Sequence, residues 1–350
     1  MSIEVDTAYL RGFADRIDAN RDGALADMHD YARAHCMNFT GLDGPLNVAE
    51  PGLRSIGEAM LELCAAARNG LGQTVTDLRT CANDYDRTDW AAAETIWSVQ
   101  PTWDVPYVYR EADVAGGSSS GPAHGAIVAL MAPAYQPENQ EAKEVLASTV
   151  GVVNDLITSL TGYDILAKIL PLVLGDWGAL KRIGRAYGEM ADGCRAVGRD
   201  LGEGMDILAP HWDSRADGTA GASRAFDYHI RGRWLPAFEA LAQMCDTVEQ
   251  MCESMAAMYA QTVKGLLFAT TMYVRKIQKG LKAIMTVTDW KKFVKGVWDV
   301  VSSLYNLVID TVTLATEQVL MFTQGVELIT ATVVMLRHEM NGDFDALRTR

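Results

Sequence analysis

Few residues in this sequence stand at spacings that support catalysis or metal binding. The run Asp18-Ala19-Asn20-Arg21-Asp22-Gly23 matches the first half of a calcium-binding loop, with acidic or amide residues at positions 1, 3 and 5 and glycine at position 6. The twelfth position of such a loop is a bidentate Glu, and here it is His29. The run also lies inside a helical stripe of apolar residues, which a coordinating loop would interrupt. We therefore interpret it as the solvated acidic face of a helix rather than as a calcium site.

A second motif, Gly117-Ser118-Ser119-Ser120-Gly121, matches the Gly-x-Ser-x-Gly pattern of a nucleophile elbow in its letters. An elbow needs a strand before the serine and a helix after it, whereas this run lies in a segment typical of a flexible connector. The sequence contains no His-Glu-x-x-His, no Cys-x-x-Cys pair and no Gly-x-x-x-x-Gly-Lys. Its six histidines are scattered, and a lone histidine near a turn is more often structural than catalytic. We expect a protein that is not an enzyme and that uses no cofactor and no metal.

The pair Tyr85 and Asp89 has chemistry that suits recognition by another protein. The two residues are four apart, so in a helix their side chains lie one turn apart on the same face. A tyrosine offers a flat apolar ring with a hydroxyl group, which fits a partner's pocket, and the aspartate adds a charge beside it. The alternative is that Tyr85 ends an apolar stripe and Asp89 is solvated. The same spacing recurs at Tyr109 and Asp113, so its meaning depends on its position in the fold.

Two long segments with apolar residues on one stripe must position this pair. One covers residues 53–96 and the other residues 5–37, and a Gly/Pro turn at 38–45 joins them. Such helices bury their stripes by folding back on each other. The stripe residues are Leu53, Ile56, Met60, Leu63, Ala67, Leu71, Val75, Leu78, Ala82 and Tyr85 in the first segment and Leu10, Phe13, Ile17, Leu25, Met28 and Tyr31 in the second.

The same plan recurs farther along the chain. A stripe from Leu180 to Leu208 and another from Leu241 to Thr262 flank the interruption Pro210-His211-Trp212-Asp213-Ser214. Several glycines in the first stripe disfavour an isolated helix by about 1 kcal/mol each relative to alanine, so we expect close backbone packing to offset them. We divide the chain into a helical hairpin at 1–99, a Pro/Gly/Ser-containing linker at 100–139, a second hairpin with lead-in helices at 140–276, and C-terminal helices with a polar tail at 277–350.

Composition supports an all-α fold and excludes some partners. The chain has 350 residues, 49% of them hydrophobic, with ten prolines that cluster between the periodic runs. We expect two tandem antiparallel helical hairpins that form an elongated bundle, plus C-terminal amphipathic helices. A net charge of −14 opposes nucleic-acid binding, which depends on neutralising phosphates. The N-terminus has neither the basic nor the apolar region of a Sec signal peptide.

Two further expectations concern the cysteines and the apolar C-terminal runs. Cys36 lies near the first turn while Cys64 lies well along the facing helix, so a disulfide between them is not expected, and the six cysteines are expected to be structural thiols. Acidic residues interrupt the C-terminal runs, so we expect none to reach the roughly 18 uncharged residues of a membrane-spanning helix. These acidic residues are Asp299, Asp310, Glu317 and Glu327.

The hairpin at 1–99 resembles the WXG superfamily of type VII (ESX) secretion substrates. Phe39-Thr40-Gly41 stands where that family has Trp-x-Gly at the turn, with phenylalanine in place of the tryptophan, and Tyr85 with Asp89 stands in its Tyr-x-x-x-Asp export motif. In the second unit, Trp212 followed by Ser214 resembles the same turn with its glycine replaced. That unit lacks a Tyr-x-x-x-Asp, and its lead-in resembles the segment before the hairpin in large actinobacterial members.

The resemblance implies a secreted or cell-surface protein that is made and folded in the cytoplasm. It implies docking to a type VII secretion ATPase or a chaperone, and pairing with a WXG-like partner or with itself. In the family, two hairpins pair antiparallel, so that the turn of one lies near the Tyr-x-x-x-Asp end of the other. We expect this chain to supply both hairpins, with Tyr85 and Asp89 near Trp212 in one composite docking surface. Large members often end in a toxin domain, whereas this chain ends in helices and a short tail.

The C-terminal region has a different character because it is basic. Lys291, Lys292 and Lys295 stand beside Trp290 and Phe293 at the start of an apolar stripe. A basic helix with an aromatic face suits an anionic membrane surface or a partner's groove. The alternative is that the stripe packs on the hairpins and the lysines meet the protein's own carboxylates. Two other functions therefore remain, a membrane-active or pore-forming effector and a cytosolic coiled-coil scaffold.

Overall fold

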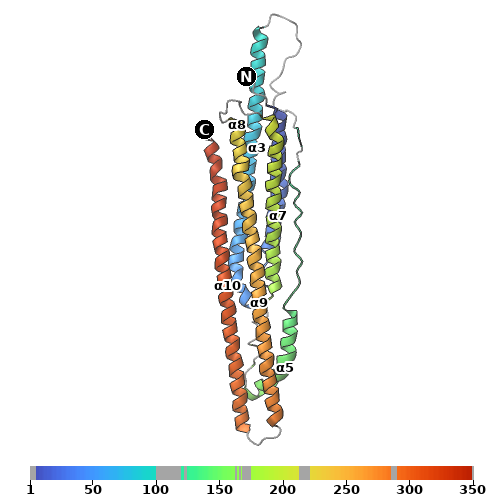
Figure 1. Cartoon of the computed structure of the whole chain (residues 1–350), viewed down its shortest axis with the longest axis vertical. Coiled ribbons are helices and arrows are strands. Elements are labelled where there is room, and N and C mark those ends of the chain that lie inside the picture. Colours follow the sequence, from blue (N-terminus) through green and yellow to red (C-terminus); the bar gives the residue numbers. More distant parts are fainter. Residues whose placement is uncertain are drawn as a thin grey trace.

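In the computed structural model the helices run side by side along one axis (Figure 1). The structure describes residues 5–99, 120–121, 124–161, 164, 167, 175–212, 221–284 and 290–348, and throughout these ranges the regular elements are helices, which confirms the all-α prediction. The elements are α1 Thr7–Ala19, η1 Asn20–Ala24, α2 Leu25–Tyr31, η2 Ala32–Cys36, η3 Gly44–Ala49, α3 Glu50–Val99, α5 Gln140–Thr161, α7 Trp177–Leu208, η4 Ala209–His211, α8 Ala222–His229, η5 Ile230–Trp234, α9 Leu235–Ile284 and α10 Trp290–Arg348.

The first hairpin consists of the segment α1 to η2 packed against α3. Asp6 caps α1 by accepting a hydrogen bond from the backbone N–H of Ala8, and the chain then stays helical through two π-helical turns, η1 and η2. The stripes predicted from the sequence form the interface, since Ile17 and Leu63 are fully buried. The apolar spacing therefore predicted both the helices and the faces that they bury.

The second hairpin, α7 with α9, contributes to the same core. Gly204 of α7 lies against the ring of Phe13, and a Cβ added there would stand 2.3 Å from that ring's Cε2. Close packing therefore offsets the glycine content of α7, as expected. The buried apolar side chains of both hairpins form one continuous cluster, so the two hairpins form a single bundle.

The C-terminal segment is part of this bundle. Helix α10 packs along α3 and α9, and α9 continues past residue 276 to Ile284, so the boundary that we expected at 276 falls inside a helix. The stretch Ser302–Arg337 of α10 is long and apolar enough to cross a membrane by length and composition, and 33% of its most apolar window is buried in the protein. We had expected the acidic residues to exclude such a stretch, and this expectation is wrong.

The second part of the expected linker is attached to the bundle. Residues 124–139 run extended beside α7 (Figure 1). The backbone N–H of Ala126 donates to Asn20 Oδ1 at 2.9 Å, and the Tyr31 hydroxyl donates to the carbonyl of Met131 at 2.8 Å. We name residues 124–139 the strap. It is a packed element, whereas we had expected residues 100–139 to be a linker between the two hairpins.

A buried polar cluster joins α1, η1 and α7. Arg16 donates to both carboxylate oxygens of Asp200, at 3.1 and 2.7 Å, and Asn20 Nδ2 donates to the same carboxylate at 2.5 Å. All three residues are buried, and Asn20 is fully inaccessible. Our interpretation of residues 18–23 as a solvated face is therefore wrong at Asn20. The π-helical turn that begins at Asn20 lies within this acidic run.

All six cysteines are free thiols, and five of them are buried. Burial raises the pKa of Cys64 to about 12 and raises the pKa of Cys36 as well, so both thiols are protonated at neutral pH. Cys81 is half-buried, and burial followed by the nearby Asp84 raises its pKa.

We predict that Asp200→Ala lowers the free energy of unfolding by about 3 kcal/mol, because it leaves the Arg16 guanidinium buried without its carboxylate. The matched control is Glu203→Gln, because Glu203 also contacts Arg16, at 3.2 Å, but its side chain is 69% exposed. The control should change stability by under about 1 kcal/mol. Urea unfolding of both variants measures the difference, and equal losses would contradict the buried pairing.

We also predict that Ellman's reagent at about pH 8 labels Cys81 first in the folded protein, because thiolate reactivity requires exposure and a low pKa. The other five thiols should react at the rate of unfolding. Cys81→Ser should remove the early phase, and an early phase that survived this substitution would contradict the burial of the remaining cysteines.

Candidate functional site

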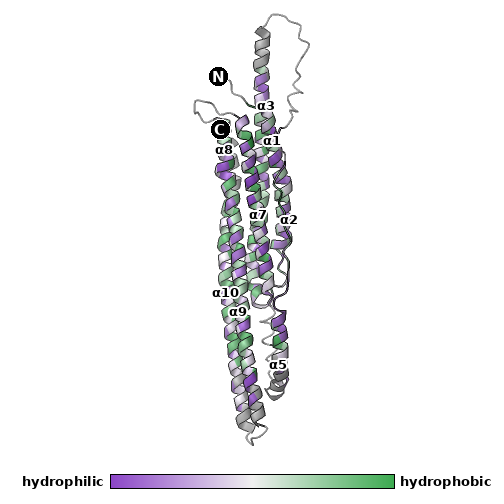
Figure 2. Cartoon of the chain, turned by 45° about the vertical axis from the view of Figure 1, so that its right-hand side comes forward, coloured by the Kyte–Doolittle hydropathy of each residue, from purple (hydrophilic) through white to green (hydrophobic). Residues whose placement is uncertain are grey.

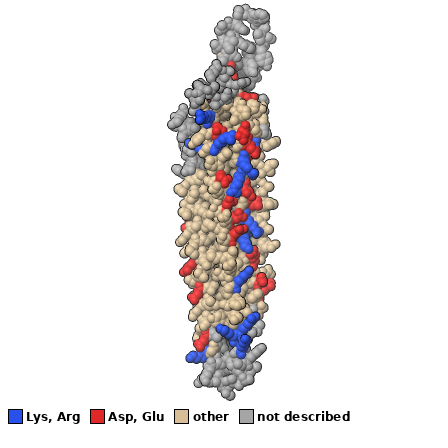
Figure 3. All heavy atoms as spheres, viewed as in Figure 1, with Lys and Arg blue, Asp and Glu red and all other residues tan. Residues whose placement is uncertain are grey.

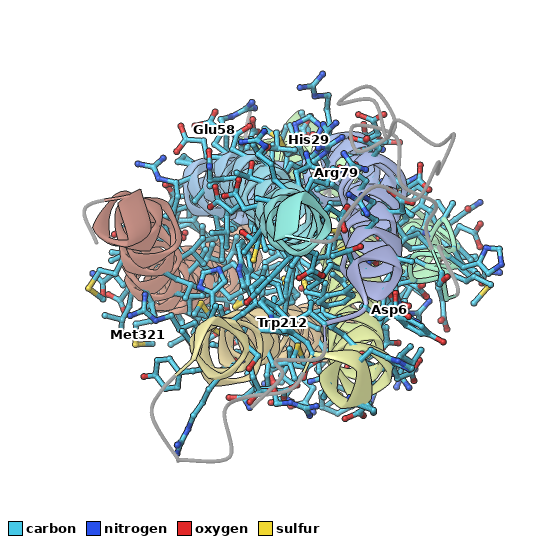
Figure 4. The ribbon with its side chains drawn as sticks, turned by 90° about the horizontal axis from the view of Figure 1, so that it is seen from above. Asp6, His29, Glu58, Arg79, Trp212 and Met321 are labelled. Carbon is cyan, nitrogen blue, oxygen red and sulfur yellow. The ribbon has the colours of Figure 1, made fainter. Side chains whose placement is uncertain are left out.

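Tyr85 of the first hairpin and Trp212 of the second meet at one end of the bundle. Trp212 Nε1 donates to the Tyr85 hydroxyl oxygen at 3.4 Å. Trp212 is 4% exposed, and Figure 4 shows it directed inward among the helix ends, whereas Tyr85 is half-buried. The expected proximity of Tyr85 to Trp212 is therefore present, with one correction: Trp212 is too deeply buried to form part of a docking surface.

The N-terminal residues hold Trp212 in place. Val5 forms an isolated antiparallel bridge with Trp212, and the backbone N–H of Asp6 donates to the carbonyl of His211 at 2.9 Å. The ring of Tyr9 stacks on that of His211 with centroids 3.5 Å apart. These contacts connect the start of α1 with the end of α7, so both hairpins build the site.

Aromatic residues from α8 and α1 pack beside the tryptophan. Phe226 of α8 lies 5.5 Å from Trp212 between ring centroids, and Phe13 of α1 meets Phe226 edge to face at 6.0 Å. Sequence reasoning placed Phe13 in the α1 stripe but missed Tyr9, His211 and Phe226. The four-residue spacing of Tyr9 and Phe13, which puts both rings on one helix face, was a usable signal.

The carboxylate that is fixed at this end is Asp86. The Thr7 hydroxyl donates to Asp86 Oδ1 at 2.7 Å, and Arg11 forms an ion pair with its other oxygen. Arg11 also donates to Asn83 Oδ1 at 3.0 Å. Asp89, one turn farther along α3, is exposed. Asp86 therefore has a structural role that sequence reasoning missed, while Asp89 is accessible to a partner.

The first hairpin's turn lies at the opposite end of α7 from Trp212. Gly41 has φ 96°, in the left-handed region that favours glycine, and its carbonyl accepts from the backbone N–H of Asp176, which precedes α7. A Cβ at Gly41 would stand 2.9 Å from the Tyr135 hydroxyl. Phe39 is half-buried beneath the guanidinium of Arg54, 4.9 Å from its ring centroid. Phe39 and Gly41 therefore form a turn that docks on the second hairpin, far from Tyr85.

A polar cluster that we did not predict surrounds this turn. The Tyr135 hydroxyl donates to Asp176 Oδ2 at 2.5 Å, and Arg182 donates to the carbonyls of Asn38 and Thr40 at 2.7 and 2.9 Å. Burial and then the hydrogen bond to Asp176 raise the pKa of Tyr135 to about 12, and burial lowers the pKa of Arg182. Asp176 is the N-cap of α7, and an aspartate just before a helical stripe is the signal that could have identified it.

The expected basic surface is described only in part. Helix α10 begins at Trp290, and of Lys291, Lys292, Lys295, Trp290 and Phe293 the structure describes only the side chain of Lys295, which is exposed. The other four side chains lie outside the described residues.

The described residues include a groove beside the strap. Within them, no group of three or more His, Cys, Asp or Glu side chains is placed to hold a metal ion. A groove of about 800 Å³ lies between the strap and the α7–α9 hairpin, lined by residues that include Ile127, Arg195 and Phe238. Arg195 is already paired there with Asp246 and Glu239.

Comparisons with known proteins do not assign the chain to a family. No family model matches it, and no curated protein or solved structure matches it significantly.

We predict that Trp212→Ala lowers the free energy of unfolding by about 3 to 5 kcal/mol, because the ring fills a buried site that both hairpins share. Trp298→Ala is the matched control, because Trp298 is 50% exposed on α10. The control should change stability by about 0.5 kcal/mol or less. Chemical denaturation measures both values, and a Trp212 variant as stable as the control would contradict the anchoring role.

Proposed function

We propose that this chain is a non-enzymatic helical substrate of a type VII (ESX) secretion system, exported through Tyr85 and Asp89. The proposal combines the resemblance of the 1–99 hairpin to WXG-superfamily substrates with the arrangement of the two hairpins. Within a cell the folded bundle is the exported species, and outside it acts as a binding or structural protein.

The observation that carries the proposal is the contact between Trp212 and Tyr85, 3.4 Å between Nε1 and the hydroxyl oxygen. In the family that the chain resembles, two separate hairpins pair antiparallel and bring a turn to the end of the partner's second helix. Here both hairpins belong to one chain, and the second hairpin's Trp212 lies beside the first hairpin's Tyr85. This chain therefore needs no separate hairpin partner to complete that arrangement.

The accessible part of the site suits a protein partner. Trp212, supported by the rings of Phe226 and Phe13, keeps Tyr85 in one orientation. Asp89 is exposed one turn farther along α3. Helix α3 projects past the adjacent helix ends, so a secretion ATPase or chaperone could approach it from several sides (Figure 1). A complementary receptor would offer an apolar pocket for the phenol edge and a cation for the carboxylate.

Export assays in the native organism test this proposal. We expect Asp89→Asn and Tyr85→Ala each to lower the exported amount about tenfold or more, since a charge-assisted contact or a buried aromatic ring contributes about 1.5 to 3 kcal/mol to binding. Asp89 is exposed, so Asp89→Asn should leave the melting temperature unchanged.

Two controls make the assay specific. Glu58→Gln changes an exposed carboxylate elsewhere on α3 (Figure 4), and Tyr109→Ala with Asp113→Ala removes the other Tyr-x-x-x-Asp of the sequence. Both should be exported like the wild type. A wild-type protein that stays in the cytosol would favour a coiled-coil scaffold instead, and normal export of Asp89→Asn would refute the motif's role.

A further inference from the structure

One end of this acidic protein is strongly basic. Residues 254–298 contain eight Lys or Arg residues and a single acidic residue, Asp289, although the whole chain has a net charge of −14. We name residues 254–298 the basic end. Its exposed cations include Arg275, Lys276 and Lys279 of α9 and Lys295 of α10. Figure 3 shows one cluster of Lys and Arg near the lower end of the molecule, besides those that lie along its length.

Large apolar side chains are exposed in the same region. Phe268 and Met272 of α9 are 71% and 44% exposed, and Trp298 of α10 is 50% exposed. Met251 of α9 packs at Gly325 of α10, which sets the register of these antiparallel helices. Because both helices rise by about 1.5 Å per residue, Phe268 lies about level with the exposed Tyr305 and Ile309 of α10. Single exposed apolar residues are common, but here several lie along one short length of hairpin.

The first hairpin ends before this region and α5 packs against α9 here (Figure 1), while Phe268, Met272 and Trp298 remain exposed. The first hairpin's α3 begins beside Thr323, whose hydroxyl donates to the carbonyl of Val48 at 3.3 Å and whose methyl group lies against Gly52. Farther toward the start of α10, that hairpin offers no long helix to cover the outer face. The apolar colouring of α9 and α10 continues to this end in Figure 2, and the face over these two helices is mostly uncharged in Figure 3.

We propose that the basic end docks on the surface of an anionic lipid bilayer. Its lysines and arginines contact headgroup phosphates, each contributing about 1 kcal/mol near the surface. Phe268, Met272 and Trp298 enter the headgroup boundary, because aromatic and long apolar side chains partition there beside snorkelling cations. Farther along α10 the exposed face also carries apolar side chains such as Met321 and Leu328, but its charges there are Asp310 and Glu317, which an anionic surface repels.

Charge and packing argue against three alternatives: a second copy of the chain, nucleic acid, and insertion of α10 across the bilayer. A second copy docking through the same patch would place the exposed Arg275, Lys276 and Lys279 of one copy against the same cations of the other. Nucleic acid would satisfy the cations but leave Phe268 and Trp298 against a polyanion. Crossing the bilayer would require α10 to leave its contacts with α3 and α9, where Val319, Phe322 and Val326 are buried.

Flotation of the full-length protein with lipid vesicles tests this inference independently of export. We expect binding to phosphatidylcholine vesicles that contain about 30% phosphatidylglycerol, little binding to pure phosphatidylcholine, and release by high salt or carbonate. Arg275→Gln combined with Lys279→Gln should weaken binding about fivefold for each charge removed. Phe268→Ser should weaken it about tenfold.

Matched controls separate docking from folding. Leu328 of α10 is 72% exposed, almost the same as Phe268, but lies outside the basic end, so Leu328→Ser should bind like the wild type. Arg33→Gln removes an exposed cation from η2 and should also have no effect. Circular dichroism should show unchanged melting for all four variants.

Four results would overturn the inference. Equal losses for Phe268→Ser and Leu328→Ser would indicate non-specific adsorption. Equal binding to neutral and anionic vesicles would remove the role of charge, and resistance to carbonate extraction would show insertion rather than docking. Binding of a DNA duplex in preference to anionic vesicles would assign the basic end to nucleic acid.

Discussion

The close approach of α1 and α2 to the glycine-bearing face of α7 is the constraint on which the arrangement of the two hairpins depends. Phe13 packs over Gly204 and Met28 over Gly193, so larger side chains at these positions of α7 would push the first hairpin away. The interior of a protein is packed at close to crystalline density, so this fit allows essentially one relative placement. The cost of glycine in α7 is offset by the core that the close approach creates.

That placement determines what meets at each end of α7. At one end it brings the residues before α1 to Trp212 and Trp212 to Tyr85. At the other end it seats the Gly41 turn on Asp176 at the start of α7. Between the ends, the same approach buries Arg16 with Asp200, a pairing that is favourable only because both groups and Asn20 hydrogen-bond one another. The polar contacts are therefore a consequence of the relative placement of the two hairpins and do not determine it.

The bundle also separates surfaces with different chemistry. Paired charges such as Arg195 with Asp246 line the junction of α7 and α9, where they are satisfied within the protein. The phenol of Tyr85 and the carboxylate of Asp89 stand at one end of the molecule, and the exposed cations and apolar residues of α9 and α10 stand at the other. A protein recognised at one end and bound to a surface at the other would use its length as a spacer. The two proposals require different partners and are physically independent.

The sequence by itself determined which segments are helical and which face each helix buries, because apolar residues at steps of three and four have one low-energy arrangement in water. The expectation that Tyr85 lies near Trp212 came instead from the resemblance to the WXG superfamily, which implies antiparallel pairing of the two hairpins. Tertiary structure alone decided that Asp86 is paired while Asp89 is exposed, that Trp212 is buried, and that the strap packs on the bundle. It also turned Asn20 inward and packed α10 against both α3 and α9, one of the two alternatives that the sequence left open. These outcomes depend on contacts between residues far apart in the chain, whose free energies are set by the geometry of the partner and not by local spacing.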